Sequence, residues 1–130
     1  MEQISKEDFF IIKDLIDNFE KDTLYFKQTL GFNSIYLESL HTETELYAKS
    51  ILDKLIISRI VLSKRREGLG SSILSELINI ANSKGFKQII IESVCTKEMM
   101  NFCLKHNFKV DKNTSILLDE LEFGNYILEL

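Results

Sequence analysis

The sequence contains no proline and no tryptophan, and only five glycines and two cysteines among its 130 residues. Two cysteines, Cys95 and Cys103, are too few for a disulfide scaffold, so we expect a reduced, cytoplasmic protein. Prolines, repeats and low-complexity segments are all missing, so the sequence shows no linker. Its length fits one domain spanning residues 1–130.

Long apolar runs and an excess of positive charge are missing as well. The longest nearly apolar stretch, residues 55–62, is interrupted by Ser58 and Arg59 and is too short to span a bilayer. Acidic residues stand near the N-terminus, where a secretion signal would be basic, so we predict no membrane or secretion role. The formal net charge is −4, which argues against a general nucleic-acid binder.

The residues that are present suffice for a core, because 45% are hydrophobic and 28% are charged. Ser5 is a helix cap, and the apolar residues from Phe9 to Phe19 follow at helical spacing, which predicts a helix ending near Glu20. A second short helix is expected over about residues 22–30, ending at Gly31. Residues 1–4 allow a short first strand.

Three strands are predicted next, over residues 34–40, 46–52 and 55–62. The links between them are so short that neighbouring strands must pair as antiparallel hairpins. Helical spacing returns over residues 69–81, and Gly85 closes that helix.

The C-terminal third is expected to alternate between strand and helix. Residues 88–94 read as a strand buried on both faces with a parallel neighbour. A helix over 97–106 and a last strand over 126–130 complete the prediction, with a further strand at 115–118 as an option. The fold class is therefore α/β.

The turn between the third strand and the following helix carries the chemistry. It reads Arg65-Arg66-Glu67-Gly68-Leu69-Gly70-Ser71-Ser72. Glycines let the backbone approach a ligand closely, and a helix start presents unpaired N–H groups and a positive dipole end to an anion. Two arginines add positive charge for a phosphate. The turn therefore predicts a phosphate cradle.

Several interpretations of this turn remain. A nucleotide P-loop is excluded, because no Lys-Ser/Thr pair follows the glycine in the required register. A dinucleotide fingerprint has two of its glycines in Gly68 and Gly70, but Ile73 occupies the third position, while Glu92 lies roughly where a ribose-binding acid would sit. The glycines could also form a tight turn and nothing else.

A further interpretation comes from resemblance. Arg65-x-x-Gly68-x-Gly70, within the run from Arg59 to Ser71, resembles the acyl-CoA signature of the GNAT N-acetyltransferases. The resemblance implies a mixed sheet, in which an antiparallel N-terminal meander is followed by a parallel βαβ unit with splayed central strands. It also implies acetyl-CoA as the co-substrate and direct attack on it by a primary amine.

The resemblance assigns cofactor contacts along one continuous segment. The strand end would pair its backbone with the pantetheine arm, and the turn would hold the pyrophosphate through backbone N–H groups, with the two arginines beside it. The residues implied are Ile60, Val61, Leu62, Arg65, Arg66, Glu67, Gly68, Leu69, Gly70, Ser71 and Ser72.

The catalytic residues implied are Glu92 and Cys103. Glu92 ends a strand that should line the gap between the splayed strands, where a carboxylate can act as base; the alternative is that it faces solvent or pairs with a lysine. This chain departs from the family's second signature, because Cys103 occupies the position at which the family usually has a tyrosine as the general acid. The acid then comes from Cys103 or from elsewhere, or the thiolate leaves unaided, or catalysis is weak.

Cys103 and His106 share a helix face, which also suggests a Cys–His nucleophile or half a metal site; the alternative is a buried thiol beside a surface imidazole, and we predict no metal. Partners implied by the resemblance are an amine-bearing small molecule or a protein acceptor, with a homodimer allowed. The aromatic residues of the N-terminal region are mostly core by their spacing, and the resemblance implies that this region walls the acceptor site, so that one or two of them would shape substrate choice. The competing function is a GNAT-like binding module without catalysis.

Overall fold

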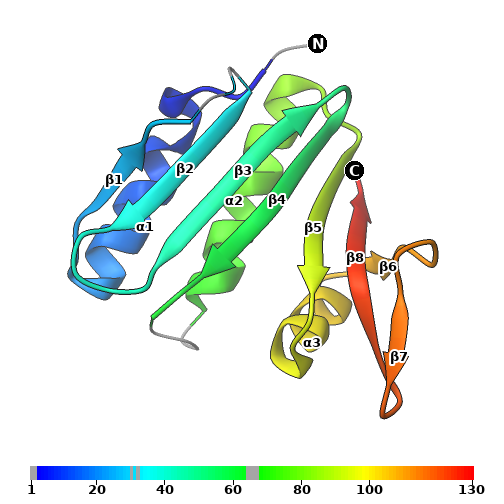
Figure 1. Ribbon diagram of the computed structural model, residues 1–130. Helices are drawn as coiled ribbons and strands as arrows, with labels where there is room; N and C mark the ends of the chain where they lie inside the picture. Colours follow the sequence, from blue (N-terminus) through cyan, green and yellow to red (C-terminus); the bar gives the residue numbers. More distant parts are fainter. Residues whose placement is uncertain (1–2, 30, 32, 64–67) are drawn as a thin grey trace.

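The computed structural model describes residues 3–29, 31, 33–63 and 68–130 (Figure 1). Its elements follow in the order η1 (Lys6–Phe9), α1 (Phe10–Glu20), β1 (Leu24–Lys27), β2 (Ser34–Ser39), β3 (Glu45–Ile51), β4 (Lys54–Val61), α2 (Leu69–Lys84), β5 (Gln88–Val94), α3 (Lys97–Lys105), β6 (Lys109–Val110), β7 (Ile116–Leu118) and β8 (Leu121–Glu129).

The strands form one sheet in the order β1-β2-β3-β4-β5-β8-β6, and β7 pairs with β8 at its side. Strands β1 to β4 are antiparallel neighbours, whereas β4 and β5 are parallel. Helix α2 makes the connection between β4 and β5 that a parallel pair requires. This is the predicted meander followed by a βαβ unit.

Helices α1 and α2 lie on one face of the meander, which we call the covered face (Figure 1). Strand residues alternate between this face and the opposite one, so every second residue of β2 and β3 is buried. Ile12 and Ile16 of α1 and Ile73 of α2 pack there against the strands. The strand residues of this core are Leu24, Ile35, Leu37, Leu46, Ala48, Leu55, Ile57, Ile89 and Ile91.

The opposite face of β1 to β5, which we call the open face, carries polar and aromatic side chains. In the described part of the chain no helix lies over its β1–β4 portion (Figure 1). The side chains that project from it and matter below are Lys27, Tyr36, Glu38, Glu45, Tyr47, Lys49, Ser58, Arg59 and Glu92.

The predicted helix over residues 22–30 is wrong, because residues 24–27 form β1, the edge strand beside β2. Lys21 takes a left-handed conformation (φ 52°) that ends α1. Asp17 then accepts the Leu24 N–H at 2.7 Å, which turns the chain back along β2. Leu24 is buried and Tyr25 exposed, a period-2 signal that the sequence analysis missed. Gln3 to Ser5 are not in a strand either, and residues 1–2 lie outside the described part.

The β5 prediction is right in its bounds and in its parallel neighbour, but wrong about two-sided burial. Ile89 and Ile91 are buried, whereas Ile90 faces the open side and is only partly covered. The other neighbour, β8, runs antiparallel. This pairing overturns the dinucleotide-fold interpretation, which needs further parallel strands.

Candidate functional site

A gap between β4 and β5 defines the candidate site. The two strands pair in parallel from Lys54 opposite Gln88 to Ile57 opposite Ile91, and the pairing ends there. Yet β4 runs on to Val61 and β5 to Val94. The two strands therefore separate toward their C-terminal ends, as the predicted splay requires, and the backbone edge of β4 beyond Ile57 faces the gap.

A β-bulge marks the point where β4 leaves β5. Ala48 of β3 is opposite Ile57 and Tyr47 is opposite Arg59, so Ser58 is the extra residue. A bulge bends and twists its strand locally. Here it accompanies the separation of the two parallel strands.

The predicted pantetheine-binding residues lie along the free end of β4. Ile60 is opposite Leu46 and Val61 is opposite Glu45, so β3 supports this segment from the other side. Ile60 and Leu62 are half-buried and pack against the core. The segment is fixed on one side and open on the other, which suits backbone pairing with an extended ligand.

Helix α2 starts at the same end of the sheet. Gly68 is its N-cap with φ 82°, a conformation that favours glycine. The Ser72 N–H donates to the Gly68 carbonyl at 2.9 Å, so it is already used within the helix. The N–H groups of Leu69, Gly70 and Ser71 belong to the first turn of the helix, where N–H groups lack the usual partner within the helix. The cofactor contacts predicted from Gly68 to Ser72 stay a prediction. Arg65, Arg66 and Glu67 lie outside the described residues.

Gly70 has a packing role that the sequence analysis did not foresee. A Cβ built at Gly70 would lie 3.2 Å from the Phe102 ring of α3. Beside it, Ser71 Oγ and His106 Nε2 form a hydrogen bond of 3.1 Å, and the His106 ring lies 4.5 Å from that of Phe102. These contacts fix α3 against the first turn of α2. His106 is thus a site residue by position, and its only sequence signal was its spacing from Cys103.

A buried carboxylate holds the chain just before the glycine turn. Glu20, at the end of α1, is 5% exposed and accepts hydrogen bonds from the hydroxyls of Thr44 and Ser63, the latter at 2.8 Å. The Ser63 N–H in turn donates to Thr44 Oγ1 at 3.0 Å. Buried charges are costly unless hydrogen-bonded, so this network fixes where β4 ends. Sequence spacing gave no sign of it, because its three members lie far apart in the chain.

Glu92 lies at the vertex of the gap, on the open face. It is the first residue of β5 beyond the last β4 pair, and Ser58 holds the same place on β4. Ser58 donates to Glu92 Oε1 at 2.8 Å, and Lys49 Nζ lies 3.6 Å from the same oxygen. The carboxylate therefore both faces the gap and pairs with a lysine.

Cys103 lies in the core. Its side chain is 0% exposed, and burial raises its pKa to about 12. A reactive thiol needs a lowered pKa and access, so this environment opposes the Cys–His nucleophile. Among the described residues no three His, Cys, Asp or Glu side chains group as metal ligands would.

Searches for relatives by sequence found none. No protein-family model matches the chain, and no curated protein is significantly similar to it. Within the described residues, no helix has the length and apolar character needed to cross a bilayer.

Solved structures, in contrast, share the fold. A GNAT family acetyltransferase from Elizabethkingia anophelis, with acetyl-CoA bound, superposes with a TM-score of 0.55 at 11% identity, over 84% of this chain and 98% of its own. The Ard1 protein of Thermoplasma volcanium gives 0.56 at 14% identity, over 99% and 95%. The PaiA N-acetyltransferase of Thermoplasma acidophilum, in complex with coenzyme A, gives 0.55 at 19% identity, over 75% and 61%. The chain has the GNAT acetyltransferase fold.

Proposed function

We propose that this protein is an N-acetyltransferase that transfers the acetyl group of acetyl-CoA to a primary amine. The observation that carries the proposal is the separation of β4 and β5 at the place where α2 begins. An unpaired strand edge and a helix N-terminus lie together there, and they match the amide-bearing arm and the pyrophosphate of one extended cofactor. Solved structures of the same fold with acetyl-CoA or coenzyme A bound support the choice.

Two parts of the cofactor, its charged pyrophosphate and its amide-bearing pantetheine arm, would bind to two different parts of the protein. The pyrophosphate takes the N–H groups at the start of α2, from Gly68 to Ser71, with Arg65 and Arg66 as its cationic partners. The pantetheine arm lies along β4 from Ile60 to Leu62. The thioester then enters the gap, near the vertex that Ser58 and Glu92 occupy.

The reaction forms a C–N bond and breaks the C–S bond. Glu92 takes a proton from the ammonium group of the acceptor, directly or through water, and the neutral amine attacks the acetyl carbonyl carbon. Backbone N–H groups beside the gap stabilise the oxyanion. As the C–S bond breaks, coenzyme A leaves as a thiolate and the nitrogen loses its second proton, which reaches the thiolate through solvent or through an acid other than the buried Cys103 and gives the amide and free coenzyme A.

A pair of substitutions at one position tests the cradle. Asn and Asp both tolerate the left-handed conformation of Gly68, and a Cβ there meets nothing within 4 Å. Gly68→Asp should weaken acetyl-CoA binding at least about tenfold by repelling the pyrophosphate, whereas Gly68→Asn should bind several-fold better than Gly68→Asp. Calorimetry with acetyl-CoA, free CoA and NAD in parallel measures this, and a thiol-release assay follows on the same samples. Equal affinity of the two variants contradicts the cradle.

A binding module is the second candidate, and the burial of Cys103 favours it. With a fully buried thiol of raised pKa at the usual acid position, the domain would hold coenzyme A without turning it over. Acetyl-CoA binding with no thiol release above background, across a panel of small amines and lysine peptides, would support this candidate over the enzyme.

A further inference from the structure

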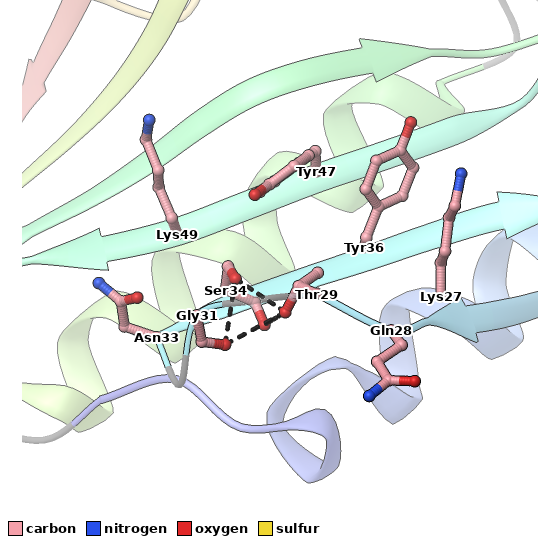
Figure 2. Close-up of a pocket in the computed structure, with 9 residues that line it drawn as sticks. All are labelled: Lys27, Gln28, Thr29, Gly31, Asn33, Ser34, Tyr36, Tyr47 and Lys49. Carbon is pink, nitrogen blue, oxygen red and sulfur yellow. Dashed lines mark hydrogen bonds between the residues drawn. The ribbon is translucent and has the colours of Figure 1, made fainter.

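A cavity of about 360 Å³ lies on the open face, between the end of β1 and the middle of β3 (Figure 2). Tyr36 and Tyr47 form one wall, and Lys27, Lys49, Asn33 and Ser34 surround it. Small-molecule sites combine this size with aromatic walls and a few polar groups. The cavity has no part in holding the cofactor as proposed above.

The tyrosines belong to a row that the strand register builds. Lys27 is opposite Tyr36, Tyr36 is opposite Tyr47, and Tyr47 is opposite Arg59. The two rings lie 4.8 Å apart at 47°, and Lys27 Nζ lies 5.2 Å from the centre of the Tyr36 ring. Figure 2 shows both lysines projecting from the same side of the strands as the tyrosines. The row offers aromatic surface between cations, which suits a flat apolar group.

The charge that faces the cavity is positive, although the chain as a whole is acidic. Its charged lining residues are Lys27 and Lys49, and Lys6 joins Lys27 in the adjoining cavity; no Asp or Glu among the described residues lines either one. The nearest acids already pair with these lysines. Glu38 lies 3.3 Å from Lys27 and Glu92 lies 3.6 Å from Lys49, while Glu45 binds Arg59 and the Tyr36 hydroxyl. An anionic group that enters the cavity would meet both lysines and share them with Glu38 and Glu92.

Lys49 connects this cavity to the vertex of the gap. Lys49 lines the cavity, and its ammonium lies 3.6 Å from the Glu92 carboxylate. A cation and an anion at this spacing match the head of an α-amino acid, whose carboxylate and amine are attached to one carbon. The carboxylate would take Lys49, the amine would take Glu92, and the side chain would lie against Tyr36 and Tyr47.

We infer that the open-face cavity is the acceptor site, and that it takes an α-amino acid with an aromatic side chain. The inference rests on the proposed function, because it makes the amine bound at Glu92 the group that is acetylated. The free α-carboxylate, held by Lys49, is what distinguishes this acceptor from a lysine side chain or a simple amine.

The test begins with binding alone. L-Phenylalanine, L-phenylalaninamide and phenethylamine are titrated into the unliganded protein by NMR or calorimetry. We expect L-phenylalanine to bind about tenfold more tightly than its amide, because only the acid offers a carboxylate to Lys49. Lys49→Gln should remove that difference. Lys112→Gln is the matched control: it removes the same charge from a lysine paired with Glu122, on another part of the chain.

Turnover is measured next, by thiol release from acetyl-CoA with the same three amines. The expected result is a kcat/KM for L-phenylalanine about tenfold above that for the amide, with the preference lost in Lys49→Gln and kept in Lys112→Gln. Equal use of acid and amide by the wild type overturns the inference, whatever the rate. Failure of acetyl-CoA to bind counts against the proposed function instead, and the amino-acid titration then still decides the site.

Discussion

The two faces of the meander are built from the same strands and organised by different forces. On the covered face, alternate residues such as Leu37 and Ile57 lose nearly all contact with water against α1 and α2. On the open face, Tyr36 packs against Tyr47 and donates a hydrogen bond to Glu45, and Glu38 pairs with Lys27; these side chains stay partly exposed to solvent. Apolar burial scales with area and dominates folding, whereas exposed ion pairs contribute little. The covered face therefore carries most of the stability, and the open face is the one on which we propose the acceptor site.

The glycine turn joins these two roles. Glu20, Thr44 and Ser63 anchor its N-terminal side within the structure, and the contact of Gly70 with Phe102 anchors its C-terminal side. A ligand-binding segment held at both ends pays less ordering entropy on binding.

The largest expected effect is on the covered face. Leu37 is 0% exposed, so Leu37→Ala should lower the free energy of unfolding by about 2–5 kcal/mol through lost burial and a cavity. Its sequence neighbour Glu38 is the control, since Glu38→Ala removes a half-buried carboxylate that pairs with Lys27 and should cost about 1 kcal/mol. Urea denaturation measures both. Similar losses in the two variants would mean that the faces do not differ as described.

The Glu20 network should come next. Glu20→Ala leaves the hydroxyls of Thr44 and Ser63 without their buried acceptor, which should cost about 2–4 kcal/mol. Because Ser63 leads into the glycine turn, acetyl-CoA affinity should fall as well. Glu43→Ala, at an exposed site in the loop before β3, is the control and should leave both quantities unchanged. A stable Glu20→Ala variant with normal affinity would remove the anchoring role.

On the open face the effect is smaller and depends on pH. The hydrogen bond to Glu45 raises the pKa of Tyr36 to about 12, with burial and the Glu45 charge adding to it. A raised folded-state pKa means that this stabilisation is complete below pH 10 and is lost as the pH rises from about 10 to 12. Near-ultraviolet absorbance should show one late-ionising tyrosine fewer in Tyr36→Phe than in the wild type, since Tyr126, whose pKa burial also raises, is present in both. Tyr47→Phe is the control and should keep the wild-type number.

A small effect is expected at the two cysteines, which differ in their exposure to reagents in the folded protein. Cys95 is exposed and Cys103 is buried, so a disulfide reagent should modify one thiol in the native protein and both after unfolding.

Cys103→Ala should leave thiol release from acetyl-CoA within about twofold of wild type, measured on a sample whose folding is verified. A loss of turnover of about a hundredfold, the scale of general acid catalysis, would restore Cys103 as the acid.

His106 offers a finer comparison at the same site. Its hydrogen bond to Ser71 spans α3 and the first turn of α2, so His106→Ala should weaken acetyl-CoA binding by a few-fold, since one neutral hydrogen bond contributes about 1 kcal/mol. His106→Gln, which keeps a side-chain amide in reach, should lose less. Calorimetry distinguishes the two, and identical affinities in both variants would show that the contact has no bearing on the cradle.

Local patterns in the sequence predicted much of this molecule. The bounds of β5 and the start of α2 agree with the prediction, because apolar period and glycine punctuation act over a few residues. The edge strand β1 was missed, since four residues with two aromatic side chains fit a helix as well as a strand. These residues form a strand because they pair with β2, and β2 is made of residues that come later in the sequence.

The sequence by itself determined the glycine at the start of α2, the alternation of the strands and the presence of Glu92 near a strand end. Only the tertiary structure decided which polar residues meet. The row from Lys27 to Arg59 exists because four strands pair in one register, and the pairs that Lys49 and Ser58 make with Glu92 exist because β5 runs parallel to β4. A period of two fixes the face on which a side chain lies, but its neighbours on that face are set by strand order and register, which depend on the whole fold.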